Sequence, residues 1–210
     1  MWNNLSEAWQ CAFEEAWASF KSGSIPIGAV IADENGNIIL REHNRSNEPD
    51  TINKNISHAE ANALRRLDTS HYNPKTLVLY ATMEPCPMCM GTAVMSNIKH
   101  LRYAARDMYC GCVHLKDIDP YLMGQRLDYT FADDEMEFVQ LTIQSYHEFR
   151  YVSQGASGVV LNRFRETNER AVILAERLFS EQKLDAFSRE QKPFSEVYDY
   201  ILSQASLTGK

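Results

Sequence analysis

The sequence lacks a long apolar run, and this absence bears on where the protein works. No part of the 210-residue chain approaches the ~20 consecutive apolar residues of a membrane span. The first residues, MWNNLSEAWQ, have neither the basic start nor the unbroken apolar segment of a secretion signal. We therefore expect a protein of the cytoplasm that makes no contact with a membrane.

The sequence also lacks an excess of basic over acidic side chains. The chain has 21 Lys and Arg residues against 28 Asp and Glu residues, a formal net charge of -7. The acidic surplus lies in residues 1–144, because residues 145–210 carry equal numbers of both signs. Proteins that hold nucleic acid through its phosphates usually show a basic surface, so the composition argues against RNA, apart from a local patch at Lys99, Arg102 and Arg106.

Internal repeats and low-complexity segments are absent too, and 44% apolar residues indicate one well-packed main domain. Apolar residues at spacings of three and four predict an amphipathic helix over residues 5–20. Two apolar runs around Asn35-Gly36 predict a β-hairpin, because both residues tolerate positive φ. Further helices are expected at 58–67 and 87–97, and further strands at 75–82, 100–105 and 136–143.

The alternation of helices with the later strands favours parallel pairing. It predicts an α/β fold with five strands and helices on both faces of the sheet. Residues 145–210 have helical spacing instead, and Gly155 and Gly158 suggest a hinge before them. We therefore expect a domain at residues 1–144 and a helical C-terminal extension at residues 145–210.

Cysteines are few, and their number is odd: five in the chain. In a reducing compartment, thiols are metal ligands, catalytic groups or core residues more often than disulfides. Cys86 and Cys89 lie three positions apart in PCPMC, at the start of a predicted helix. This spacing places both sulfurs on one face of the helix, and the positive end of the helix dipole there favours the thiolate form. Taken alone, the pair also fits half of a zinc ribbon or a redox pair.

The second predicted helix supplies a partner for these thiols. His58 begins it, and one imidazole with two thiolates suits zinc and leaves a fourth tetrahedral position for water. Zinc lowers the pKa of bound water, and Glu60 is placed to carry the proton. Glu60 has a structural alternative, since SHAE (57–60) also fits a helix capping box.

A fourth protein ligand would instead close the metal site and make it purely structural. Cys110, Cys112 and His114 in YCGCVH are the candidates for such a ligand or for a second metal site. A single glycine between the two thiols makes shared chelation awkward. We expect this segment to line a pocket or to form a plain loop.

The motif and its flanks resemble a known superfamily. HAE followed by PCPMC resembles the H-x-E and P-C-x-x-C pattern of zinc-dependent nucleobase deaminases. PIGAVI, HNR, HAEANALR, TLVLYATMEPCPMCMGTAVMSNI and AARD follow the order seen in the branch of tRNA adenosine, guanine and cytosine deaminases, over roughly residues 5 to 144. The chain departs from the tRNA-acting members in two features. It has NISHAE where their sequences resemble DPTAHAE, and it has a helical extension that is not part of their pattern.

The resemblance implies a fold, a cofactor and a set of site residues. The fold would be a three-layer α/β/α cytidine deaminase-like sandwich with a mixed five-stranded sheet, usually as a homodimer. His58, Cys86 and Cys89 would bind Zn²⁺, and Glu60 would be the proton shuttle. Asn44 and Ala59 would contact the substrate, although Asn44 also fits a turn in an Asn-rich loop.

The implied reaction is hydrolytic deamination. Zinc-held hydroxide would attack the amino-bearing ring carbon of a nucleobase or nucleoside, and ammonia would leave. A tRNA-specific adenosine deaminase is the alternative, with tRNA as the partner. A non-catalytic, zinc-stabilised base-binding protein is the alternative of another class, and Glu60 argues against it because a buried carboxylate beside zinc has little structural benefit.

Overall fold

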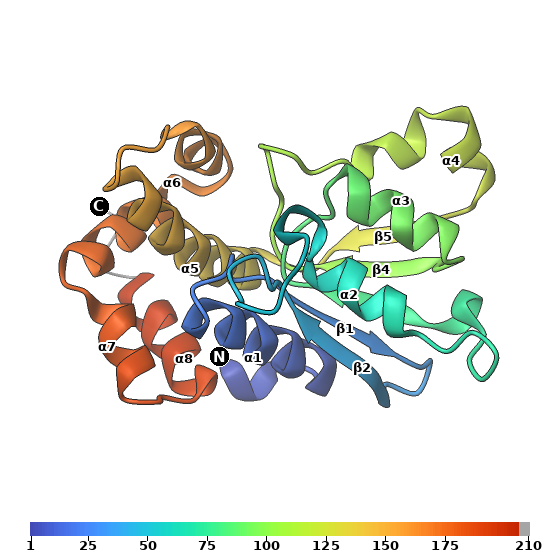
Figure 1. The fold of residues 1–210 in the computed structure, drawn as a ribbon, viewed down its shortest axis with the longest axis horizontal. Coiled ribbons are helices and arrows are strands. Elements are labelled where there is room, and N and C mark those ends of the chain that lie inside the picture. The colour runs from blue at the N-terminus through green and yellow to red at the C-terminus, as the bar shows by residue number, and fades with distance from the viewer. Residues whose placement is uncertain (206–210) are drawn as a thin grey trace.

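The computed structural model describes residues 1–205, which fold around a five-stranded mixed sheet (Figure 1). The strand order is β2-β1-β3-β4-β5; β1 pairs antiparallel with β2 and β3, whereas β3, β4 and β5 run parallel. The mixed five-stranded sheet is therefore confirmed. The strands are β1 Gly28–Ala32, β2 Ile38–His43, β3 Val78–Ala81, β4 His100–Tyr103 and β5 Asp128–Phe131.

The fifth strand of the sheet is not the segment at residues 136–143 that the sequence predicted. Residues 136–143 belong to a long helix, α5 (Asp134–Val152), and the edge strand is β5. Asp133 caps this helix, because its Oδ1 accepts a hydrogen bond from Met136 N at 2.8 Å. Every residue from Met136 to His147 is buried, including polar ones such as Glu137 and Gln140. The segment therefore lacks the exposed polar face by which a surface helix is recognised in a sequence.

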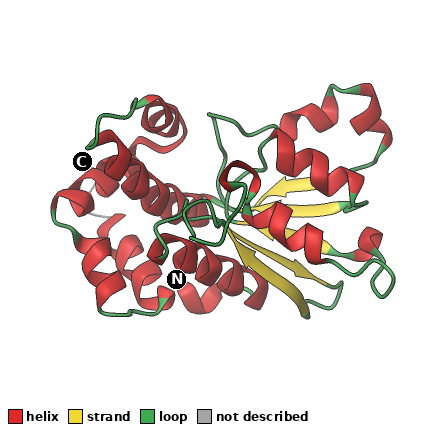
Figure 2. Ribbon diagram, in the orientation of Figure 1, coloured by secondary structure: helices red, strands yellow, loops and turns green. Residues whose placement is uncertain are grey.

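Helices cover both faces of the sheet (Figure 2), which confirms the three-layer α/β/α arrangement. Alternate residues of β1 point to opposite faces. Ala29 and Ile31 pack in one apolar cluster with α2 and α3, and Val30 packs in another with α1 and α5. The remaining helices are α1 Glu7–Lys21, α2 Ala59–Arg66, α3 Pro87–Met95, α4 Pro120–Gly124, α6 Val159–Ser180, α7 Lys183–Arg189 and α8 Phe194–Ala205, with short 3-10 helices at Trp2–Asn4, Lys54–Ile56, Pro74–Thr76 and Val113–Asp117.

The C-terminal helices gather at the far end of the molecule from α4 (Figure 1). They share an apolar core with α1, where the rings of Phe13 and Phe194 stack at 5.8 Å between centroids. The expected boundary between residues 144 and 145 falls inside α5. Within α6, Asn168 has non-helical φ and ψ, so the segment before it forms a separate helical piece. The two-part division of the chain stays a prediction.

Among residues 1–205, no helix combines the length and apolar character that crossing a membrane requires.

Candidate active site

Two helix starts bring the expected metal ligands together. His58 is the residue before α2, Cys86 is the residue before α3, and Cys89 lies in the first turn of α3 after Pro87. His58 Nδ1 is 3.6 Å from the sulfur of Cys86 and 3.6 Å from the sulfur of Cys89. Tetrahedral zinc with Zn–S of about 2.3 Å and Zn–N of about 2.0–2.1 Å separates neighbouring nitrogen and sulfur ligands by roughly 3.6 Å. The three residues therefore fit a zinc ion.

The ligand set leaves a coordination position open. The ligand atoms of His58, Cys86 and Cys89 all lie within 4.8 Å of one another, and they form the one such His, Cys and carboxylate group found in the described part of the chain. The YCGCVH segment (109–114) makes no second group there and adds no ligand to the first. Three protein ligands are the arrangement of catalytic zinc sites, in which water or substrate takes the fourth position.

The two thiols are electrostatically prepared for a cation. The pKa of the Cys86 thiol is lowered to about 4, chiefly because the Cys89 thiol donates a hydrogen bond to it. The same contact raises the pKa of Cys89, so the two sulfurs share one proton. A metal ion that binds both sulfurs displaces this proton, because thiolates are the ligands.

Glu60 is a buried carboxylate with a free oxygen. It lies in the first turn of α2 and is 3% exposed, yet its Oε2 has no hydrogen-bond partner among the described residues. Burial raises the pKa of this carboxyl. The capping-box alternative is wrong: His58 is the cap residue of α2, and the Ser57 hydroxyl donates to the Asn53 carbonyl instead.

Asn44 follows β2 and is fully buried. Its Oδ1 accepts a hydrogen bond from Ser46 N at 2.9 Å, so the turn role expected for an Asn at this place is real. Its Nδ2 has no partner within residues 1–205, and Asn44 lines the same cavity as Glu60. Ala59 is different, because its side chain packs in the core with α2 and α3 and is not part of the cavity wall. Its substrate contact stays a prediction.

The cavity beside the ligands has a volume of about 170 Å³. Pockets for drug-sized ligands occupy roughly 300–1,000 Å³, so this one suits a ligand of about one ring system. His58, Cys86, Glu60 and Asn44 all lie in its wall. A more open cavity of about 460 Å³ adjoins it through the shared Glu84 and Asp107 walls, but none of those four residues lines it.

Helices α5 and α6 supply wall residues that the sequence did not single out. They are Gln144 and Glu148 of α5 and the apolar side chains of Val160 and Phe164 of α6. Burial raises the pKa of the Glu148 carboxyl to about 7. No local motif marks these positions, since they are spaced as ordinary helix residues and reach the cavity only through tertiary packing, in which α6 lies on α5.

Two acidic residues of the wall hold loops. Glu84 accepts backbone hydrogen bonds from Asp107 N at 3.1 Å and Val113 N at 3.0 Å. Asp107 in turn accepts from Tyr109 N at 2.8 Å. A Cβ at Gly111 would lie 2.6 Å from the Glu84 carboxylate, so only glycine fits there. The 107–113 loop is thus held in place around the pocket.

Comparison with known proteins gives a match to one family model. Residues 3–105 match the model of the cytidine and deoxycytidylate deaminase zinc-binding region. The tRNA-specific adenosine deaminase of Bacillus subtilis (strain 168) is 39% identical over 105 residues, and that of Streptococcus pyogenes serotype M1 is 38% identical over 106. These matches cover 48% and 50% of this chain but only 62% and 60% of the relatives.

Solved structures agree with the fold. The structure from a study of A-to-I editing by tRNA:A34 deaminases has a TM-score of 0.52 and 27% identity, covering 60% of this chain and 96% of that one. A guanine deaminase from Nitrosomonas europaea has a TM-score of 0.53, covering 66% of this chain and 81% of that one, and at 19% identity it supports the fold alone. Residues 3–105, with His58, Glu60, Cys86 and Cys89 among them, therefore match the cytidine and deoxycytidylate deaminase zinc-binding region.

Proposed function

We propose that this protein is a zinc-dependent hydrolase that removes the amino group of a nucleobase ring and releases ammonia. The observation that carries the proposal is the free Oε2 of buried Glu60, beside three zinc ligands and a base-sized cavity. A zinc ion held by His58, Cys86 and Cys89 supplies a Lewis acid that lowers the pKa of water in the cavity.

Glu60 moves the protons of this reaction. Its carboxylate accepts a proton as water adds to the amino-bearing ring carbon and passes it to a ring nitrogen. It then accepts the proton of the hydroxyl group now on that carbon and passes it to the departing amine. Water is consumed and ammonia is formed, so atoms and charges balance. The raised pKa of Glu60 suits a group that must both accept and release a proton near neutral pH.

Asn44 and the α5–α6 wall would hold the ring. Because Asn44 Oδ1 is engaged by Ser46, Asn44 offers the ligand only its Nδ2 donor, which calls for an acceptor on the base. Glu148 offers a second carboxyl, and Val160 and Phe164 offer apolar surface for the ring.

The relatives favour adenosine in tRNA as the substrate. Curated tRNA-specific adenosine deaminases that match the chain include proteins 36–39% identical to it. A cavity of about 170 Å³ accommodates a base that has been rotated out of an RNA loop, because only the base must enter. The aligned segment spans about three fifths of those relatives, so the substrate is a proposal.

A free base or nucleoside is the second candidate, and specific observations favour it. Val160 and Phe164 cover the cavity from outside the segment that matches the family. The basic patch expected for RNA is also engaged: Arg102 pairs with Asp128 at 2.7 Å, and Arg106 pairs with Glu137 at 2.7 Å.

The test is ammonia release by the zinc-loaded protein on a panel of substrates. The panel contains cytosine, adenine and guanine, their nucleosides and nucleotides, and an anticodon stem-loop of tRNA with adenosine at the wobble position. Conversion of the stem-loop alone assigns tRNA editing, and conversion of a free base or nucleoside assigns a metabolic deaminase. If no compound is converted, the catalytic proposal fails and the non-catalytic zinc protein gains support.

The expected homodimer stays a proposal as well. Large apolar side chains are exposed around α3 and α4, including Met95 at 73%, Tyr121 at 58% and Met123 at 58%. Tyr121 and Met95 lie together, with the hydroxyl oxygen 4.0 Å from the sulfur. Light scattering of the purified protein gives its mass, and Met95→Asp should shift a dimer toward monomer.

A further inference from the structure

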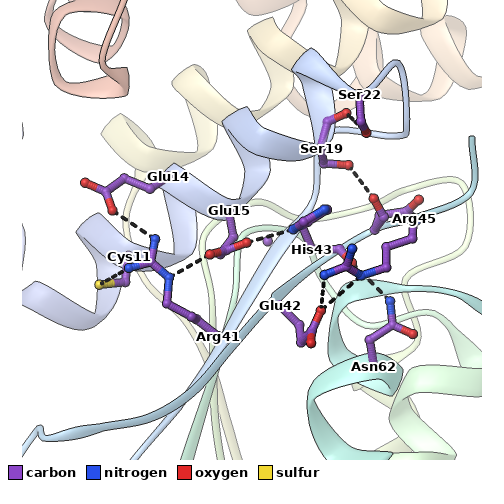
Figure 3. Close-up of polar contacts among 12 residues, drawn as sticks. Cys11, Glu14, Glu15, Ser19, Ser22, Arg41, Glu42, His43, Arg45 and Asn62 are labelled. Atoms are coloured by element: carbon purple, nitrogen blue, oxygen red, sulfur yellow. Dashed lines mark hydrogen bonds and ion pairs between the residues drawn. The ribbon is translucent and has the colours of Figure 1, made fainter. Parts of the chain in front are cut away.

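His43, the last residue of β2, is held between two carboxylates. Its Nδ1 lies 2.8 Å from Glu15 of α1, and its Nε2 lies 2.7 Å from Glu48 in the loop after β2. Figure 3 shows His43 and Arg41 reaching from β2 to Glu15 on α1, with Arg41 Nε at 2.6 Å from Glu15. The imidazole therefore bridges the first helix and the loop that carries Asn44.

Both ring nitrogens of His43 must donate in this arrangement, because carboxylate oxygens only accept. Burial lowers the pKa of His43, but the hydrogen bonds to Glu15 and Glu48 raise it more, so the net pKa is raised. The protonated His43 ring balances the charges of the network around it. That network contains four carboxylates and three guanidinium groups: Glu14, Glu15, Glu42 and Glu48 with Arg41, Arg45 and Arg66.

The network continues to α2, which carries Glu60. Arg45 contacts Glu48 at 2.8 Å and Glu42 at 2.9 Å, and Arg66 of α2 also pairs with Glu42. Glu42 is 3% exposed, so its two guanidinium partners compensate a buried charge. The ion pairs thus connect α1, β2, the loop after β2, and α2.

The backbone around Asn44 is fixed from three sides. Asn44 N donates to the Ile27 carbonyl at 3.0 Å, and the buried Ser19 hydroxyl lies 2.8 Å from the Asn44 carbonyl. Asn62 Nδ2 of α2 donates to the His43 carbonyl at 3.0 Å. With these bonds made and Oδ1 engaged by Ser46, the one group of Asn44 left without a partner among residues 1–205 is Nδ2, which belongs to the cavity wall.

We propose that His43 is a positioning residue, which ties α1 to the 44–48 loop and so aims the Asn44 amide at the base. This inference rests on the proposed function, in which Asn44 holds the substrate. His43 itself does not line the cavity and acts only through Asn44.

The proposal predicts a dependence on pH with a defined sign. A raised pKa in the folded state means that the bridge is complete below the ordinary His pKa of about 6.5 and is lost as pH rises through the raised value. When the proton leaves, a ring lone pair faces a carboxylate of Glu15 or Glu48. The KM of the wild type should therefore rise at alkaline pH, and this rise should be absent from His43→Gln.

A double-mutant cycle tests the route through Asn44. For each panel substrate that the wild type converts, we expect His43→Gln to raise KM about tenfold, the equivalent of one hydrogen bond, with zinc content unchanged and kcat altered less. In an Asn44→Ala background the same substitution should change KM less than about twofold, because coupled residues are not additive. His100→Gln is the matched control, since His100 also bonds a carboxylate, Asp128 at 3.1 Å, away from the cavity.

Hydrogen exchange at the Asn44 amide gives a readout that needs no turnover. We expect exchange of this amide to quicken about tenfold in His43→Gln and not in His100→Gln. If the wild type converts no panel compound, the proposed function fails, and the exchange rates still decide whether the bridge holds the loop. The inference is overturned if His43→Gln leaves the exchange rate of the Asn44 amide unchanged. It is also overturned if the effects of His43→Gln and Asn44→Ala on KM are additive, or if the exchange quickens while KM stays the same.

Discussion

Residues 3–105 and the helices α5 and α6 form one cavity but contribute different chemistry to it. The first region supplies His58, Cys86, Cys89, Glu60 and Asn44, from two helix starts and a strand end. The second region supplies Gln144, Glu148, Val160 and Phe164, and it lies outside the segment that matches the deaminase family. Under the proposed function, the first region would carry the reaction and the second would influence the choice of substrate, so substitutions in the two regions should have separable effects.

Removing one metal ligand should have the largest effect. Cys86→Ser replaces a thiolate whose pKa is already lowered to about 4 with a poor zinc ligand, so we expect loss of bound zinc and of activity together. Zinc content by atomic emission and ammonia release measure both. Cys11→Ser is the control and should keep both, because the half-buried Cys11 of α1 contacts Arg41 and does not line the cavity. Stoichiometric zinc in Cys86→Ser would show that the ligand assignment is wrong.

Glu60→Gln should separate proton transfer from metal binding. The side chain keeps its size but loses the ability to shuttle a proton, so we expect kcat to fall by about 10²–10⁴-fold, the usual contribution of general acid–base catalysis. Zinc content should stay at the wild-type level. Glu34→Gln, in the exposed β1–β2 turn, is the matched control. Full activity in Glu60→Gln would exclude the proposed mechanism.

Phe164→Leu should affect the second region alone. The substitution reduces the apolar wall over the ring, so we expect KM to rise about tenfold, the size of effect that a small change in an apolar pocket produces. Zinc content should not change. Phe179→Leu is the control on the same helix, because Phe179 packs against Tyr146 and Phe149 rather than the cavity. Equal kinetics in the two variants would show that α6 takes no part in binding.

Glu148 should give the smallest effect, visible mainly as a pH dependence. Its pKa in the folded protein is raised to about 7, above the ordinary Glu value of about 4.3. The folded state therefore holds a proton that the unfolded chain releases, and the contribution of Glu148 to stability falls as pH rises from about 4 to about 7. Glu148→Gln should remove this fall. Urea unfolding at pH 5 and pH 8 measures it, and an identical pH dependence in both proteins would contradict the burial of this carboxyl.

Local signals predicted the first region well. The Asn35-Gly36 turn, the helix that starts after His58 and the Pro87 helix start are all set by residues within a few positions of one another. The metal ligands followed from the same cues, since Cys86 and Cys89 share one helix turn and His58 begins another. Such features depend little on the rest of the chain.

The second region could not be predicted, because its role depends on packing over long distances. Residues 136–143 were predicted to be a strand, because a helix that is buried on all sides shows no polar face in its sequence, and the Asp133 cap that identifies the helix was not recognised. Val160 and Phe164 reach the cavity only because α6 packs on α5. The bridge between His43 and Glu15 was likewise hidden, since the two residues lie 28 positions apart in sequence.

The contact between α1 and α8 has a consequence for how the chain folds during synthesis. Trp2 N donates to Asp199 at 2.8 Å, Trp17 Nε1 donates to the Lys192 carbonyl at 3.0 Å, and Phe13 stacks on Phe194. Helix α1 thus leaves the ribosome long before the α8 segment against which it packs. Contacts of such high sequence separation slow folding, so the aromatic face of α1 stays exposed, and prone to aggregation, until α8 has been synthesised.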